Sequence, residues 1–138
     1  MAYAGDLSPV QAYKLLSDEP DAVLVDVRTR AEWSYVGLPD LSGLGREVIR
    51  IEWVSFPDGA RNPRFQEELA EAGVGPDVPV AFLCRSGVRS VAAAELVAAA
   101  GFARAYNIAE GFEGGLDGDG HRGGAGGWKA AGLPWRQS

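Results

Sequence analysis

Short apolar runs alternate with stretches of helical periodicity along this chain. Four runs are nearly continuous and rich in β-branched residues, as expected for strands buried on both faces of a parallel sheet. They span residues 22–27, 48–53, 79–84 and 105–108. Helical spacing recurs at residues 8–18, which open on the capping pair Ser8-Pro9, and at 30–35, 63–72 and 90–100.

This alternation of strands and helices predicts the fold class. With right-handed crossovers, it gives one α/β domain over residues 1–138, with a mostly parallel central sheet and helices on both faces. Ligands of such sheets bind at the carboxyl ends of the strands. The segment 114–127 is so rich in glycine that we expect a mobile surface loop without regular structure.

Composition narrows the classes of function. The 138 residues carry a net charge of -6, which disfavours nucleic acids and anionic membranes as partners. The first six residues do not resemble a signal peptide, and no apolar run is long enough to span a bilayer, so we expect a cytoplasmic protein. The single cysteine, Cys84, excludes an internal disulfide and a cysteine-rich zinc site.

Cys84 stands where a buried strand turns into a tight loop before an alanine-rich helix. Loop amides and the positive end of that helix converge there and favour an anion such as a thiolate. Arg85 and Arg89 add positive charge, and Gly87 supplies a backbone turn. A buried cysteine in a purely structural role is the alternative. The polar, doubly basic loop favours a catalytic nucleophile instead.

The sequence resembles the rhodanese family at this loop, since CRSGVRS at 84–90 has a cysteine, four residues, an arginine and a serine. The stretches 25–28 and 32–33 look like the early family signature, and 127–134 looks like its closing segment. The resemblance implies a rhodanese-like sheet of about five strands, with Cys84 as the sulfur acceptor. It also implies a cradle for the persulfide and donor formed by Arg85, Ser86, Gly87, Val88 and Arg89.

The resemblance leaves several residues in supporting roles or outside the site. Asp26, Arg28 and Ser90 are candidate supporting residues, and Asp26 is the preferred acidic contributor because we expect Glu32 to be a solvated helix residue. The family's histidine before the early proline is missing in Gly37-Leu38-Pro39. The long segments 40–50 and 114–127 are expected to reshape the rim of the pocket.

Three functions remain open. The first is transfer of sulfur from thiosulfate or a similar donor, without cofactor or metal, to cyanide, a small thiol or a protein thiol. The second is a phosphatase or arsenate reductase, although related loops of that kind have five residues between cysteine and arginine and this one has four. The third is a non-catalytic binding module. His121, the only histidine, and the acidic pair 117–119 are too isolated to predict a metal site.

Overall fold

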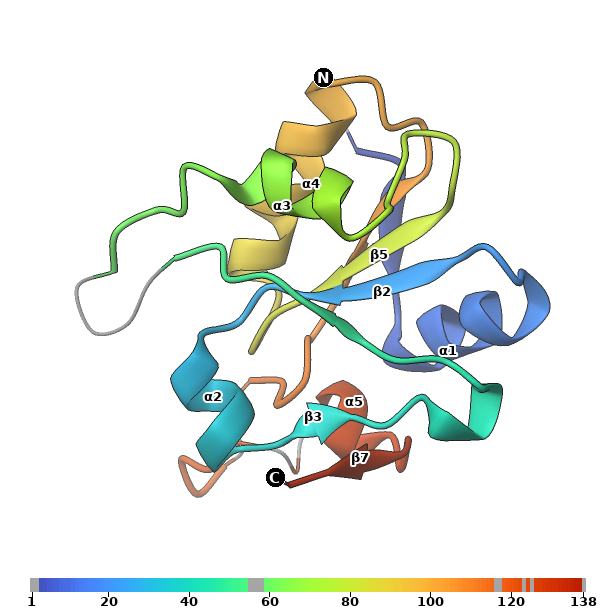
Figure 1. Ribbon diagram of the computed structural model, residues 1–138. Helices are drawn as coiled ribbons and strands as arrows, with labels where there is room; N and C mark the ends of the chain where they lie inside the picture. Colours follow the sequence, from blue (N-terminus) through green and yellow to red (C-terminus); the bar gives the residue numbers. More distant parts are fainter. Residues whose placement is uncertain (1–2, 55–58, 116–117, 123, 125, 138) are drawn as a thin grey trace.

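Five short strands form one parallel sheet at the centre of the molecule (Figure 1). The structure is a computed structural model that describes residues 3–54, 59–115, 118–122, 124 and 126–137. The strand order is β1-β6-β5-β2-β4. The strands are β1 (Gly5–Leu7), β2 (Val23–Asp26), β4 (Ile49–Arg50), β5 (Val80–Leu83) and β6 (Ala105–Ile108).

The central strands divide their apolar side chains between two cores. Because side chains alternate along a strand, Val80 and Phe82 enter one core while Ala81 and Leu83 enter the other. Both faces are therefore covered, which explains the continuous apolar runs in the sequence.

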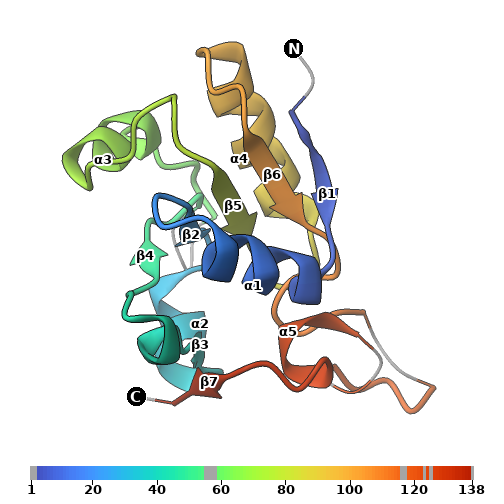
Figure 2. The ribbon, with the colours of Figure 1, turned by 90° about the vertical axis from the view of Figure 1, so that its right-hand side faces the viewer.

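Helices close both cores, as Figures 1 and 2 show. On one face lie α3 (Phe65–Glu71) and α4 (Val88–Ala99), and on the other lie α1 (Pro9–Asp18) and α5 (Gly127–Ala130). The helix α1 begins as predicted, because the Ser8 hydroxyl accepts a hydrogen bond from the Gln11 amide and the Gln11 side chain accepts one from the Ser8 amide.

A smaller layer lies beyond the carboxyl ends of the strands. It contains α2 (Arg30–Tyr35) and the antiparallel pair of β3 (Leu38–Pro39) with β7 (Trp135–Arg136). A turn of 3-10 helix at Ser42–Leu44 follows β3 and packs toward α1. This layer brings the last residues of the chain back beside α2, so the sheet edge where ligands gather is framed by distant segments (Figure 1).

The predicted fold class is confirmed, with local differences. The strand β1 was not predicted, because Gly-Asp-Leu has no apolar run, yet it pairs with β6. The run 48–53 forms ladder pairs only at Ile49–Arg50, and α4 begins two residues earlier than predicted, at Val88.

The glycine-rich segment 114–127 is partly packed, contrary to the expectation of a loop without regular structure. Gly114 and Gly127 are buried, and Gly127 begins α5. A Cβ at Gly114 would collide with the Gly126 backbone, so glycine permits this close approach. Residues 116, 117, 123 and 125 lie outside the described residues, and the expected mobility of the segment stays a prediction.

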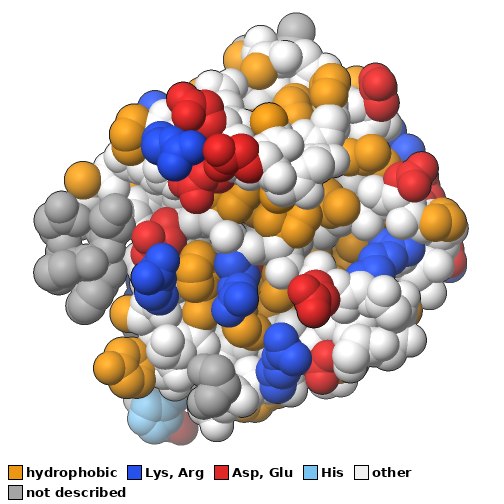
Figure 3. Space-filling model, in the orientation of Figure 1, with side chains coloured by type: hydrophobic (Ala, Val, Ile, Leu, Met, Phe, Trp, Pro, Cys, Tyr) orange, Lys and Arg blue, Asp and Glu red, His pale blue; other side chains and the backbone are white. Residues whose placement is uncertain are grey.

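The outer surface carries mixed charge. On the face shown in Figure 3, acidic and basic side chains are interspersed and do not gather into one patch of a single sign. No helix within the described part of the chain is both long enough and apolar enough to cross a bilayer.

An ion pair without solvent contact lies at the end of β2. The Asp26 carboxylate accepts hydrogen bonds from the Arg28 side chain, the shortest of them 2.7 Å, and both side chains are 0% exposed. The same guanidinium donates to the Gly37 carbonyl at 2.7 Å and lies 4.2 Å from the centre of the Phe112 ring. One buried cation therefore joins β2, the start of β3 and the segment after β6.

Replacing Arg28 by methionine should destabilise the protein by about 3–5 kcal/mol, because the Asp26 charge would stay buried without its partner. Urea unfolding would measure the loss. The matched control is Arg64→Met, whose side chain pairs with Glu67 and Glu71 at the surface and should change stability by less than about 1 kcal/mol. Equal effects of the two substitutions would contradict this account.

Candidate active site

Cys84 follows β5 directly and is 1% exposed. Its Sγ accepts a hydrogen bond from the Gly87 amide at 3.0 Å and lies 3.2 Å from the Ser90 Oγ. Gly87 has φ +112° and precedes α4, so the predicted glycine turn is present and aims its amide back at the sulfur. The loop therefore supplies Cys84 with one backbone donor.

The Cys84 loop is held from behind by a segment that the motif did not reveal. The Cys84 carbonyl accepts from the Phe112 amide at 2.8 Å, and the Arg85 carbonyl accepts from the Glu113 amide at 3.0 Å. Gly111 has φ +63°, and a Cβ there would overlap the Cys84 and Arg85 backbone. This glycine is needed for the close approach, which the sequence could not show because residues 84 and 111 are far apart in the chain.

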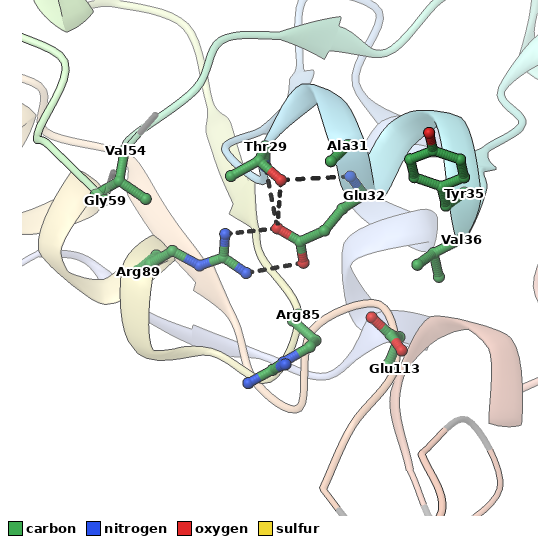
Figure 4. A pocket seen from close by; sticks show the side chains of 10 residues that line it. All are labelled: Thr29, Ala31, Glu32, Tyr35, Val36, Val54, Gly59, Arg85, Arg89 and Glu113. Atoms are coloured by element: carbon green, nitrogen blue, oxygen red, sulfur yellow. Dashed lines mark hydrogen bonds and ion pairs between the residues drawn. The ribbon is translucent and has the colours of Figure 1, made fainter. Parts of the chain in front are cut away.

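Glu32 is not the solvated residue that was expected. Its carboxylate forms a two-point ion pair with Arg89, with 2.7 Å from Oε1 to Nη1 and 3.0 Å from Oε2 to Nη2 (Figure 4). Glu32 also caps α2, where its Oε1 accepts from the Thr29 amide at 3.1 Å. The error arose because helical periodicity shows which face of α2 is polar, but not that this face meets the start of α4.

This ion pair fixes the charge of Glu32. Burial alone would raise the pKa of the carboxyl, but hydrogen bonds from Arg89 and Thr29 and the Arg89 charge outweigh it and lower the pKa to about 2. Glu32 therefore stays ionised across the physiological range, and much of the Arg89 charge is already compensated.

A pocket of about 610 Å³ opens beside the loop, between α2 and the residues around Arg85 (Figure 4). Arg85 is exposed and forms no ion pair with any of the described residues. The α2 side of the pocket combines the charged Glu32 with apolar side chains. The lining residues are Thr29, Ala31, Glu32, Tyr35, Val36, Val54, Gly59, Arg85, Arg89 and Glu113.

The remaining candidate residues divide between the loop and the interior. Ser86, in the loop beside Cys84, is half-buried, and Val88, the first residue of α4, is 78% exposed. Ser90 is fully buried and lies against the sulfur, as a supporting residue would. Asp26 and Arg28 pair with each other and do not line the pocket, whereas Glu32 does.

Neither long segment contributes a described residue to the pocket lining, contrary to the expectation that both reshape the rim. No residue of 40–50 lines the pocket, and neither does any described residue of 114–127. Arg46 instead donates to the Glu19 and Ala22 carbonyls, both at 2.9 Å, and fastens the first segment to the turn after α1. In the described part of the chain, no three His, Cys, Asp or Glu side chains are grouped to hold a metal ion.

Several known proteins are similar to this chain over most or nearly all of its length. Residues 4–138 match the family model of the STR4 middle domain. The crystal structure of Rv0390 from M. tuberculosis is 55% identical with a TM-score of 0.90, covering 99% of this chain and 100% of that one. An uncharacterized protein of Rickettsia conorii is 36% identical over 95% of this chain and 96% of its own. The thiosulfate sulfurtransferase GlpE of Glaesserella parasuis is 31% identical over 79% of this chain and 83% of its own.

Glu32→Gln should lower stability at pH 7 by about 2 kcal/mol, because the ion pair is lost. Glu32 has a lowered pKa in the folded protein, so its contribution is full above about pH 5 and declines as the pH falls toward 2. The gap between wild type and variant should therefore shrink over that range in urea unfolding. The exposed Glu47→Gln is the control, and a gap that stayed constant with pH would contradict the ion-pair explanation.

Proposed function

Because the chain belongs to the rhodanese-like family, we propose that it is a sulfurtransferase in which Cys84 carries a sulfur atom as a persulfide. The observation that carries the proposal is the placement of Cys84. Its sulfur lies at the carboxyl end of β5 with the Gly87 amide 3.0 Å away, and Arg85 and Arg89 of the same segment line a pocket. A purely structural cysteine needs neither the turned amide nor the arginines.

With thiosulfate as donor, the Cys84 thiolate attacks the outer sulfur. A bond forms between the two sulfur atoms, the sulfur–sulfur bond of thiosulfate breaks, and sulfite leaves with the electron pair. An acceptor nucleophile such as cyanide then attacks the outer sulfur of the persulfide. Thiocyanate forms and the Cys84 thiolate is regenerated, so the cycle needs no redox cofactor.

The two arginines of the pocket have different surroundings, so we infer different roles for them. Arg89 is compensated by Glu32 and acts mainly to hold α2 against the loop. Arg85 is exposed and remains the cation that can pair with the anionic end of a donor and with departing sulfite. The pocket is much larger than a small anion requires, which supports an acceptor bulkier than cyanide, such as a thiol on a larger molecule.

The chain cannot resolve its own persulfide, because Cys84 is its only cysteine. Sulfur must therefore leave to an external acceptor. A phosphatase-like reaction remains the weaker alternative. Only four residues separate Cys84 from Arg89, and a loop this short is too small to surround a phosphoryl group with its three equatorial oxygens.

The decisive experiment is intact-mass measurement after incubation with thiosulfate, followed by cyanide. We expect the mass of one sulfur atom to be gained and then removed, with thiocyanate released, and neither change in Cys84→Ser. An aryl phosphate is tested in parallel. Phosphate release without sulfur loading would overturn the proposal in favour of phosphatase chemistry, and no reaction with any sulfane donor or phosphate would indicate a binding module.

Arg85→Ala should raise the KM for thiosulfate by about tenfold, because it removes one charge-assisted contact to the anion. Arg85→Lys should restore part of the loss, since it keeps the charge. Steady-state thiocyanate formation measures both, with Arg64→Ala, at the residue before α3, as a matched arginine control. An unchanged KM in Arg85→Ala would show that this arginine does not bind the donor.

A further inference from the structure

A line of hydrogen bonds connects Cys84 with the molecular surface. The Ser90 Oγ lies 3.2 Å from the Cys84 Sγ and 2.5 Å from the Asn107 Oδ1. The Asn107 Nδ2 donates to the Asp6 Oδ1 at 3.0 Å, and the same oxygen accepts from the Tyr3 hydroxyl at 2.7 Å. Ser90 and Asn107 are buried, whereas Asp6 is exposed. Nothing in the active-site loop motif points to the three outer residues.

Asp6 determines which way the Asn107 amide faces. Asp6 on β1 is the ladder partner of Asn107 on β6, so the two side chains meet across neighbouring strands. Hydrogen bonds from Asn107 and from Tyr3 lower the pKa of Asp6, which is therefore a carboxylate and can only accept. The NH₂ group of Asn107 must face Asp6, and its carbonyl oxygen must face Ser90.

The orientation of Asn107 in turn determines the direction of the Ser90 hydroxyl. A hydroxyl has one proton, and the Asn107 carbonyl at 2.5 Å can only accept it. The Ser90 oxygen then presents a lone pair to the Cys84 sulfur. A thiol can donate its S–H to that lone pair, whereas the negative charge of a thiolate is repelled by it.

We propose that Asn107, fixed by Asp6, is a positioning residue that turns the Ser90 hydroxyl into a hydrogen-bond acceptor toward Cys84 and so opposes the free thiolate. Only the Gly87 amide then stabilises the charge on Sγ by a hydrogen bond within the described structure. In a persulfide the charge lies on the outer sulfur, away from Ser90. The relay therefore favours the sulfur-loaded form, a consequence that rests on the proposed function.

The charged groups around Cys84 come from several elements and would all be retained when Asn107 is changed. They are Arg85 and Arg89 from the loop and α4, Asp26 with Arg28 from the end of β2, Glu32 from α2, and Asp6 from β1. A change in the pH dependence of Cys84 alkylation can then be assigned to the direction of the Ser90 hydroxyl.

Asn107→Leu tests the relay directly, because leucine keeps the approximate volume and removes the carbonyl acceptor. The rate of alkylation of the only cysteine by iodoacetamide is followed by mass spectrometry across pH. We expect the profile of the variant to move to lower pH, with alkylation about tenfold faster at pH 6, since Ser90 can now donate to the thiolate. Ser90→Ala should shift the profile less, and the double variant should match Ser90→Ala.

A merely structural role gives a different result, because loosening the core would raise the rate at every pH without moving the midpoint. An unshifted midpoint in Asn107→Leu, or a double variant that matched Asn107→Leu, would overturn the proposal. Asp6→Ala tests the same relay from the exposed end and should shift the profile in the same direction, and no shift would also count against it. Tyr3→Phe is the matched control, because it leaves the carboxylate in place.

No sulfur donor enters these measurements. The relay can therefore fail while persulfide formation succeeds, and persulfide formation can fail while the relay is confirmed.

Discussion

The Arg28 guanidinium lies without solvent contact between the Asp26 carboxylate, the Gly37 carbonyl and the Phe112 ring. A buried charge of this kind is tolerated only while its partners surround it, so it constrains every segment that supplies one. The strand β2, the end of α2 and the segment after β6 are thereby held in one arrangement. The Phe112 amide in turn holds the Cys84 carbonyl, which ties the active-site loop to the same cluster.

This arrangement explains why the exposed positive charge of the site and the cysteine sulfur lie in different surroundings. Because α2 is held in place, Glu32 reaches Arg89, and this ion pair links the layer of α2 to the start of α4. Arg85 is then the exposed cation at the pocket, while the sulfur itself is buried among a backbone amide and a serine hydroxyl. The loop thus combines a buried thiol with an exposed guanidinium.

The sequence predicts the position of a functional residue where its partners lie only a few residues away in the chain. Cys84, Gly87 and Ser90 belong to one strand–loop–helix unit, so their proximity follows from chain connectivity, and Ser8 caps α1 because its partner is three residues away. Glu32, Gly111 and Asn107 could not be placed in this way. Each meets the loop from another element, and no local sequence pattern indicates that contact.

The sequence by itself determined the fold class and singled out Cys84 as the candidate nucleophile, since buried parallel strands need continuous apolar runs and the chain holds one cysteine. Tertiary structure alone decided how that cysteine is surrounded. Strand register placed Asp6 beside Asn107, and the packing of α2 against α4 placed Glu32 against Arg89. Such pairings depend on distances between segments far apart in the chain, on which local propensity and spacing carry no information.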